Sequence, residues 1–225
     1  NKILVYYQPI VECATGDIVK YEALVRLERD GVVYSPFHFL TAARYAGLLH
    51  KLTKRVIQIA FEKFSGSWLS LSINITDMDL MEGGFIDFVE SMRMRYALER
   101  NQICFELLEE TSLSENRLAQ KQIRSLLDFG YRIVIDDFGV QCSNFAQMGS
   151  VELDSIKIDG KFIKDLNENI HSRNVTESIV FFATKAGFSL VAEFVHSSEI
   201  YELVRSLGIQ YAQGYYLGEP RPYLL

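Results

Sequence analysis

The stretch Arg132-Ile133-Val134-Ile135-Asp136-Asp137-Phe138-Gly139 places three β-branched residues directly before two adjacent carboxylates. Such an apolar run is typical of a short, fully buried strand. Because consecutive side chains of a strand point to opposite faces, one of the two acids must point into whatever the strand end surrounds. Carboxylates held this close repel unless one takes up a proton or a cation binds. A helix N-cap with a neighbouring acid is the alternative for an isolated Asp-Asp pair.

Length, composition and charge bound the class of protein. The chain has 225 residues, of which 48% are hydrophobic and 23% charged, so we expect an ordinary globular protein. This length suits one large domain over residues 1–225, and a closed α/β barrel falls in this range. The net charge of −6 argues against a nucleic-acid polymer as partner, since there is no basic stripe. An anionic substrate would need positive charge from the site, for which metal ions are suited.

Cysteine usage and the chain start bear on location. Cys13, Cys104 and Cys142 are odd in number and widely spaced, which favours reduced thiols in the cytoplasm over disulfides or a zinc site. The sequence contains neither a signal peptide nor an apolar run approaching the roughly 20 residues that span a bilayer. The chain begins at Asn1 and enters a strand almost at once. We therefore expect a cytoplasmic domain excised from a longer protein, which could itself be membrane-anchored.

Strand-like and helix-like segments alternate along the chain. The pattern predicts strands at 4–11, 18–27, 68–75, 103–108, 132–138, 155–159, 189–193 and 209–215. It predicts helices at 36–45, 48–64, 85–97, 114–129 with Ser114 as N-cap, 172–186 and 198–207, and at most a short helix at 144–148. This alternation is typical of a mainly parallel sheet. We expect a modified TIM-type (β/α)8 barrel, with an initial hairpin that makes one strand near the N-terminus antiparallel.

Polar residues fall at or near the ends of seven predicted strands: Glu22, Asn74, Glu106, Asp136 with Asp137, Lys157, Glu193 and Gln213. In a barrel these ends converge on one face, where active sites are built. Any single one could be a satisfied core group, but unpaired buried acids cost several kcal/mol each, on the order of 3–5, so core stabilisation is a poor explanation of the whole set. Oxygen ligands with one amide and no His or Cys suit Mg²⁺ or Mn²⁺. Two such ions roughly 3.5–4 Å apart form the arrangement that cleaves phosphodiesters. A lysine there would hold the attacking hydroxide or neutralise charge on phosphate.

At these residues the chain resembles the EAL domain family, the bacterial cyclic di-GMP phosphodiesterases. The signature segment is Tyr21-Glu22-Ala23-Leu24-Val25-Arg26. The resemblance also includes Gln8-Pro9-Ile10, Ser72-Ile73-Asn74-Ile75-Thr76, Glu106-Leu107-Leu108-Glu109, Asp136-Asp137-Phe138-Gly139, Lys157-Ile158-Asp159, Ala192-Glu193 and Gln213-Gly214-Tyr215. A lone Glu-Ala-Leu would mean nothing, whereas this ordered set is specific and covers nearly the whole chain.

The resemblance implies a barrel that hydrolyses cyclic di-GMP to linear pGpG with two Mg²⁺ or Mn²⁺ ions. It implies that the first ion is held by Glu22, Asn74, Glu106 and Asp136, and the second by Asp136 and Asp137, with Glu193 near it as ligand or base. It also implies that Lys157 contacts the nucleophilic water and that the substrate is bound by Gln8, Arg26 and Gln213. Glu109 would anchor the loop after the Asp-Asp strand. The resemblance also implies a homodimer through the barrel, and sensory or diguanylate-cyclase-like domains elsewhere in the full-length chain.

The sequence departs from the family pattern at three places. Where the family loop after the Asp-Asp strand usually has the sequence DFGTGYSS, this chain has Asp136-Asp137-Phe138-Gly139-Val140-Gln141-Cys142-Ser143-Asn144. Where the family has AEGVE, this chain has Ala192-Glu193-Phe194-Val195-His196. Arg44 stands where the family usually has Glu. Loss of a glycine makes a left-handed backbone costly, so we expect the second ion to be weakly held. The alternative function is a degenerate receptor that binds cyclic di-GMP without turnover. A purely structural barrel for protein interactions is a third possibility.

Overall fold

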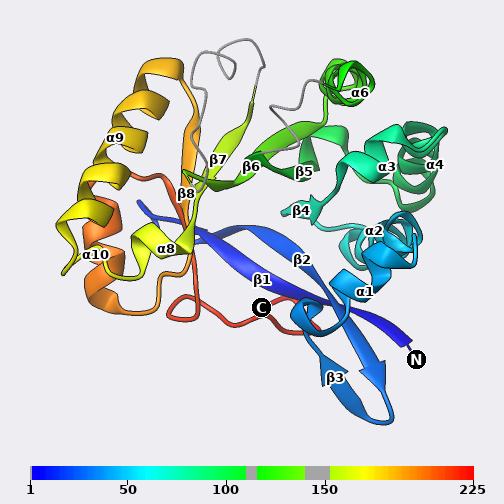
Figure 1. Ribbon diagram of the computed structural model, residues 1–225, viewed down its shortest axis with the longest axis horizontal. Helices are drawn as coiled ribbons and strands as arrows, with labels where there is room; N and C mark the ends of the chain where they lie inside the picture. The colour runs from blue at the N-terminus through cyan, green and yellow to red at the C-terminus, as the bar shows by residue number, and fades with distance from the viewer. Residues whose placement is uncertain (1, 110–115, 140–152) are drawn as a thin grey trace.

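Eight strands of the described chain form a closed barrel in the order β1-β9-β8-β7-β6-β5-β4-β2, which β1 closes by pairing with β2. The computed structural model describes residues 2–109, 116–139 and 153–225 (Figure 1). The strands are β1 (Lys2–Glu12), β2 (Ile18–Arg29), β3 (Val32–Tyr34), β4 (Ser70–Asn74), β5 (Ile103–Leu108), β6 (Arg132–Phe138), β7 (Ser155–Ile158), β8 (Ser189–Ala192) and β9 (Tyr211–Gln213). β1 runs antiparallel to both neighbours, and the other barrel pairs are parallel. The predicted modified TIM-type barrel is therefore confirmed.

Helices surround the barrel on both sides. They are η1 (Pro36–His38), α1 (Leu40–Tyr45), α2 (Leu49–Phe64), α3 (Asp77–Met81), α4 (Phe85–Tyr96), η2 (Arg100–Gln102), α6 (Arg117–Asp128), α8 (Gly160–Ile163), α9 (Ile170–Ala186) and α10 (Ser198–Ser206). In Figure 1, α8, α9 and α10 lie on one side and α1 to α4 on the other. The short strand β3 extends the hairpin beyond the barrel by pairing with β2.

Several helix boundaries differ from the sequence prediction. The expected helix 36–45 is a 3₁₀ turn followed by the short α1. The described helix α6 has its N-cap at Asn116, whose side chain accepts hydrogen bonds from the Leu118 and Ala119 amides, and the predicted cap Ser114 lies outside the described residues. Helix α9 begins two residues earlier than predicted, because Asn169 caps it in the same way. The segment 144–148 also lies outside the described residues.

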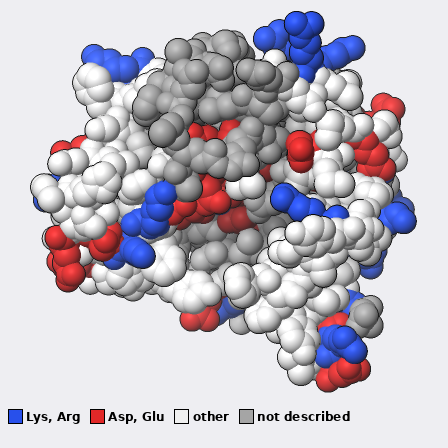
Figure 2. Space-filling model, in the orientation of Figure 1, with Lys and Arg blue, Asp and Glu red and all other residues white. Residues whose placement is uncertain are grey.

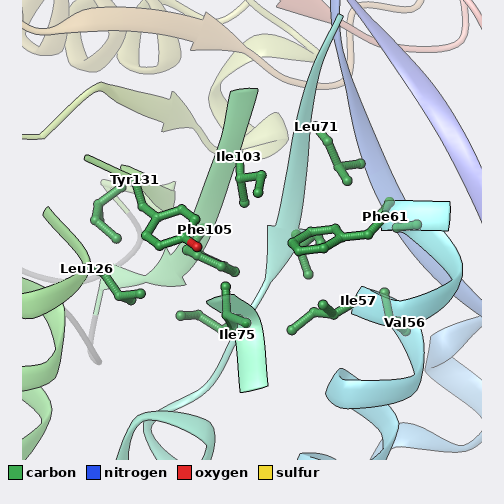
Figure 3. Packing of buried hydrophobic residues seen from close by; sticks show 14 of the residues in the cluster. Val56, Ile57, Phe61, Leu71, Ile75, Ile103, Phe105, Leu126 and Tyr131 are labelled. Carbon is green, nitrogen blue, oxygen red and sulfur yellow. The ribbon is translucent and has the colours of Figure 1, made fainter. Parts of the chain in front are cut away.

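The apolar core lies mostly between the barrel strands and the surrounding helices. Figure 3 shows Phe61 and Ile57 of α2 against Leu71 of β4, with Phe105 of β5 beside Tyr131. The first five residues of β5 are buried, as expected for a parallel strand covered on both faces. A second cluster packs α8, α9 and α10 on β6 to β9. Because the core occupies these outer layers, the carboxyl ends of the strands are left to carry polar groups.

Candidate active site

Lys157 lies at the centre of the polar residues inside the barrel. It comes from β7, its side chain is 1% exposed, and its ammonium meets four acids from separate strand ends. The distances from Lys157 Nζ are 3.2 Å to Glu22 Oε2, 2.9 Å to Glu106 Oε2, 3.1 Å to Asp136 Oδ1 and 2.8 Å to Glu193 Oε1. The strand-end residues that the sequence singled out thus converge on one point.

Three amide side chains extend this group around Glu22. Asn74 donates from Nδ2 to Glu22 Oε1 at 2.7 Å, and Gln213 donates from Nε2 to Glu22 Oε2 at 2.7 Å. Gln213 also donates to Gln8 Oε1 at 3.1 Å, and Gln8 in turn donates to the Gly218 carbonyl at 3.2 Å. The structure therefore places Gln8 and Gln213 in the wall that orients Glu22, and their contact with substrate stays a prediction.

A backbone irregularity brings both acids of the Asp-Asp pair to the same place. The pairing of β6 with β7 shifts register between Ile135 and Phe138, and Asp137 adopts a left-handed conformation with φ 54°. In a regular strand the two carboxylates would diverge. Here carboxylate oxygens of Asp136, Asp137 and Glu193 all lie within 4.8 Å of one another. The pair ends a strand and caps no helix, so the N-cap alternative is excluded.

Negative charge is in excess at this site. Four acids, namely Glu22, Glu106, Asp136 and Glu193, contact the ammonium of Lys157, and a carboxylate oxygen of Asp137 lies within 4.8 Å of those of Asp136 and Glu193. Burial, followed by the charge of Asp136, raises the pKa of Asp137 to about 6. Burial also raises the pKa of Glu193 above its ordinary value. For Lys157, burial lowers the pKa, but the surrounding carboxylates outweigh it and raise the pKa well above the ordinary value. One ammonium does not balance the acids, which favours binding of further cations.

The donor set fits a hard divalent cation. Its atoms are carboxylate and amide oxygens, which Mg²⁺ and Mn²⁺ prefer. Glu106 Oε1 is buried and has no hydrogen-bond partner among the described residues, so it is an orphaned acceptor that a cation would satisfy. The acidic group Asp136, Asp137 and Glu193 could hold a metal ion and corresponds to the predicted second site. The ligands predicted for the first ion lie together, with three of them in contact with Lys157.

Two of the predicted residues, Glu109 and Arg26, make their contacts outside the carboxylate centre. Glu109 accepts a hydrogen bond from the Gly139 amide at 3.2 Å, next to the start of the altered loop. The loop departures at 140–144 lie outside the described residues. Arg26 donates to the Val25 carbonyl at 2.9 Å and lies over the Tyr6 ring. It is not among the residues that line the cavities next to Asp136. Its predicted phosphate contact thus stays a prediction.

Two cavities open at the carboxylate centre and share Leu24 and Asp136 in their walls. The first has a volume of about 730 Å³ and includes residues that sequence reasoning did not place in the site, namely Lys161, Lys164 and Phe194. Figure 2 shows acidic side chains within a hollow, with basic side chains on the rim over α8. The sequence signal for the lysines was their position just after the Lys157-Ile158-Asp159 motif. Phe194 has a left-handed φ of 57° at the position where the family pattern has glycine.

Comparisons with known proteins agree with the fold and give the family. Residues 1–220 match the EAL domain, and the chain belongs to this family. It is 31% identical over 234 residues to the cyclic di-GMP phosphodiesterase PdeB of Shewanella oneidensis, covering 99% of this chain and 27% of that protein. It is 32% identical over 229 residues to the cyclic di-GMP phosphodiesterase PdeF of Escherichia coli K12, covering 99% and 30%.

A solved structure gives the same result in three dimensions. The PaMucR phosphodiesterase in complex with c-di-GMP superposes with a TM-score of 0.92 at 26% identity, covering 98% of this chain and 92% of that one. The chain spans under a third of the length of the two curated relatives. Within the described residues, no helix has both the length and the apolar character that crossing a bilayer requires.

Proposed function

We propose that the chain is a metal-dependent phosphodiesterase that hydrolyses cyclic di-GMP to linear pGpG. The observation that carries this proposal is the convergence of five acids and one lysine at the carboxyl ends of the barrel strands, with three of the acids close enough to share a cation. The family and the names of its relatives support cyclic di-GMP as the substrate. Two Mg²⁺ or Mn²⁺ ions are the cofactors that this donor set suits.

The residues of the chain divide into ligands and groups that handle the proton and charge. Glu22, Asn74, Glu106 and Asp136 would hold one ion, and Asp136, Asp137 and Glu193 the other. When bound, such ions polarise the phosphodiester and make water more acidic. Lys157 would orient the attacking water with its N–H donors and neutralise charge that develops on phosphate. Glu193 lies near the second ion as ligand or base, and as a base it would accept a proton from that water.

Substrate would enter through the two cavities that meet at Asp136. The lysines on the first cavity's rim supply positive charge that the acidic centre lacks, which favours approach of an anionic dinucleotide. A homodimer through the barrel, further sensory or cyclase-like domains and a cytoplasmic location stay predictions.

The decisive experiment incubates the purified domain with cyclic di-GMP and either Mg²⁺ or Mn²⁺, and follows the linear product by chromatography. The comparison variant is Lys157→Ala, which should lose turnover while still binding the ions. Binding of the dinucleotide with no product under either metal, also in the full-length protein, would favour the receptor. Absence of any binding would favour a structural barrel.

A further inference from the structure

The second cavity lies on the α1 and α2 side of the carboxylate centre. It has a volume of about 750 Å³, and its walls are mainly apolar side chains, including Leu24, Pro36, Leu40 and Leu49. Asp136 and Leu24 belong to both cavities, so the two spaces are continuous at the acidic group. A ligand whose reacting phosphate lies at Asp136 can therefore extend into either one.

Arg44 is the basic residue among the described side chains that line this second cavity. It is exposed, on the last turn of α1, and in the described part of the chain no hydrogen bond or ion pair engages its guanidinium. A guanidinium presents five N–H donors in a planar fork, and it recognises pairs of acceptors that lie side by side in one plane. The cavity thus combines apolar walls that suit a flat ring with one free, planar donor.

We propose that Arg44 selects guanine by donating to the O6 and N7 atoms of one base of the dinucleotide. This inference rests on the proposed function. A cyclic dinucleotide with its scissile phosphate at Asp136 extends a nucleoside to each side, so one base enters the apolar second cavity. Guanine presents two acceptors, O6 and N7, on one edge, which match the arginine fork. Adenine presents an amino group in place of O6, and this donor opposes the N–H groups of Arg44.

A phosphate contact by Arg44 would behave differently from base recognition. Lysine keeps a point charge for phosphate but lacks the planar fork. If Arg44 contacted phosphate, Arg44→Lys would retain affinity and would treat guanine and adenine dinucleotides as the wild type does. If it reads guanine, Arg44→Lys loses only part of the discrimination, because lysine can still donate to O6 or N7 but lacks the planar fork. Arg44→Gln then shifts preference towards adenine, because glutamine pairs with the adenine N6 and N7 atoms.

The test measures equilibrium binding of cyclic di-GMP and cyclic di-AMP by calorimetry with Ca²⁺, with chromatography to verify that both nucleotides stay intact. We expect the ratio of the two dissociation constants to fall roughly tenfold or more in Arg44→Gln, with an intermediate fall in Arg44→Lys. The matched control is Arg55→Gln, on an exposed part of α2 that does not line the cavity, where the side chain donates a hydrogen bond to Gln58 Oε1. It should leave the ratio unchanged.

Two outcomes separate this inference from the function beneath it. A wild type that binds cyclic di-GMP, with the same ratio in Arg44→Gln, overturns the role of Arg44 and leaves the proposed function intact. A wild type that neither binds nor hydrolyses either dinucleotide overturns both. Because Arg44 is exposed, its variants should unfold at the wild-type temperature, so a lost ratio cannot be ascribed to misfolding.

Discussion

Replacement of Lys157 by methionine tests whether the carboxylate centre is built to hold positive charge. The change removes the ammonium that lies 2.8 to 3.2 Å from four acids and keeps a side chain of similar length. Removing one partner of a buried ion pair costs about 3–5 kcal/mol. For a domain of 225 residues each kcal/mol corresponds to about 2–4 °C, so the metal-free variant should unfold roughly 10 °C below the wild type.

Added Mn²⁺ should restore much of this loss. Without the lysine, the acids repel one another more and attract a cation more strongly, and a ligand that binds only the folded state raises its stability. Calorimetric scans with and without Mn²⁺ should thus show a larger metal-induced shift in Lys157→Met than in the wild type. The control is Lys20→Met, because Lys20 is also buried but pairs with Asp154, 3.6 Å away, outside the acidic centre. Equal metal shifts in all three proteins would refute the electrostatic argument.

Three further changes test particular contacts. Asp136→Asn should lose turnover and weaken ion binding, because this acid borders both proposed ions; a calorimetric metal titration identical to that of the wild type would exclude the bridging role. Glu90→Gln should cost on the order of 2 kcal/mol at neutral pH, since the hydrogen bond from Arg100 helps lower the pKa of Glu90 to about 2. A lowered pKa stabilises the fold above the unfolded value, so in urea unfolding the gap to the wild type should close as the pH falls below about 4.5, and a constant gap would contradict this. Gly160→Ala should lower the free energy of unfolding by about 1–3 kcal/mol, because the added Cβ would lie 2.6 Å from the Cβ of Phe194. In a double-mutant cycle, Phe194→Gly should relieve that loss, and additive effects of the two changes would disprove the contact.

Much of the site could be predicted because strand ends in a barrel meet at one face. Glu106 follows a short apolar run, and Glu22 and Lys157 lie within short strand-like segments, so this local signal is enough to place them near strand ends and hence together. The number of acids that share Lys157 was not predictable, since spacing along the chain does not fix distances across a barrel. The substrate role that the family resemblance implies for Gln8 and Gln213 stays a prediction, and spacing did not indicate that they bond to each other beside Glu22.

The remaining differences come from backbone conformation and local caps. The residue pattern of β6 does not indicate its register shift relative to β7. Positive φ is uncommon for residues other than glycine, so the left-handed conformation of Asp137 could not be predicted either. Phe194 shows the same effect directly after Glu193. Helix starts moved because Asn116 and Asn169 offered side-chain acceptors near the predicted boundaries, and several residues near a helix start could serve as the cap. Such choices depend on tertiary packing as well as on local sequence.

The most direct test of the metal-dependent site is an anomalous difference map from crystals of the domain soaked in Mn²⁺. We predict a peak within coordination distance of Asp136, Asp137 and Glu193, and a second peak on the side of Glu22, Asn74 and Glu106. The peak at Asp136, Asp137 and Glu193 should have the lower occupancy, because the altered loop follows Asp137. A map with no peak at these carboxylates, while Lys157 keeps all its contacts in saturating Mn²⁺, would contradict the account.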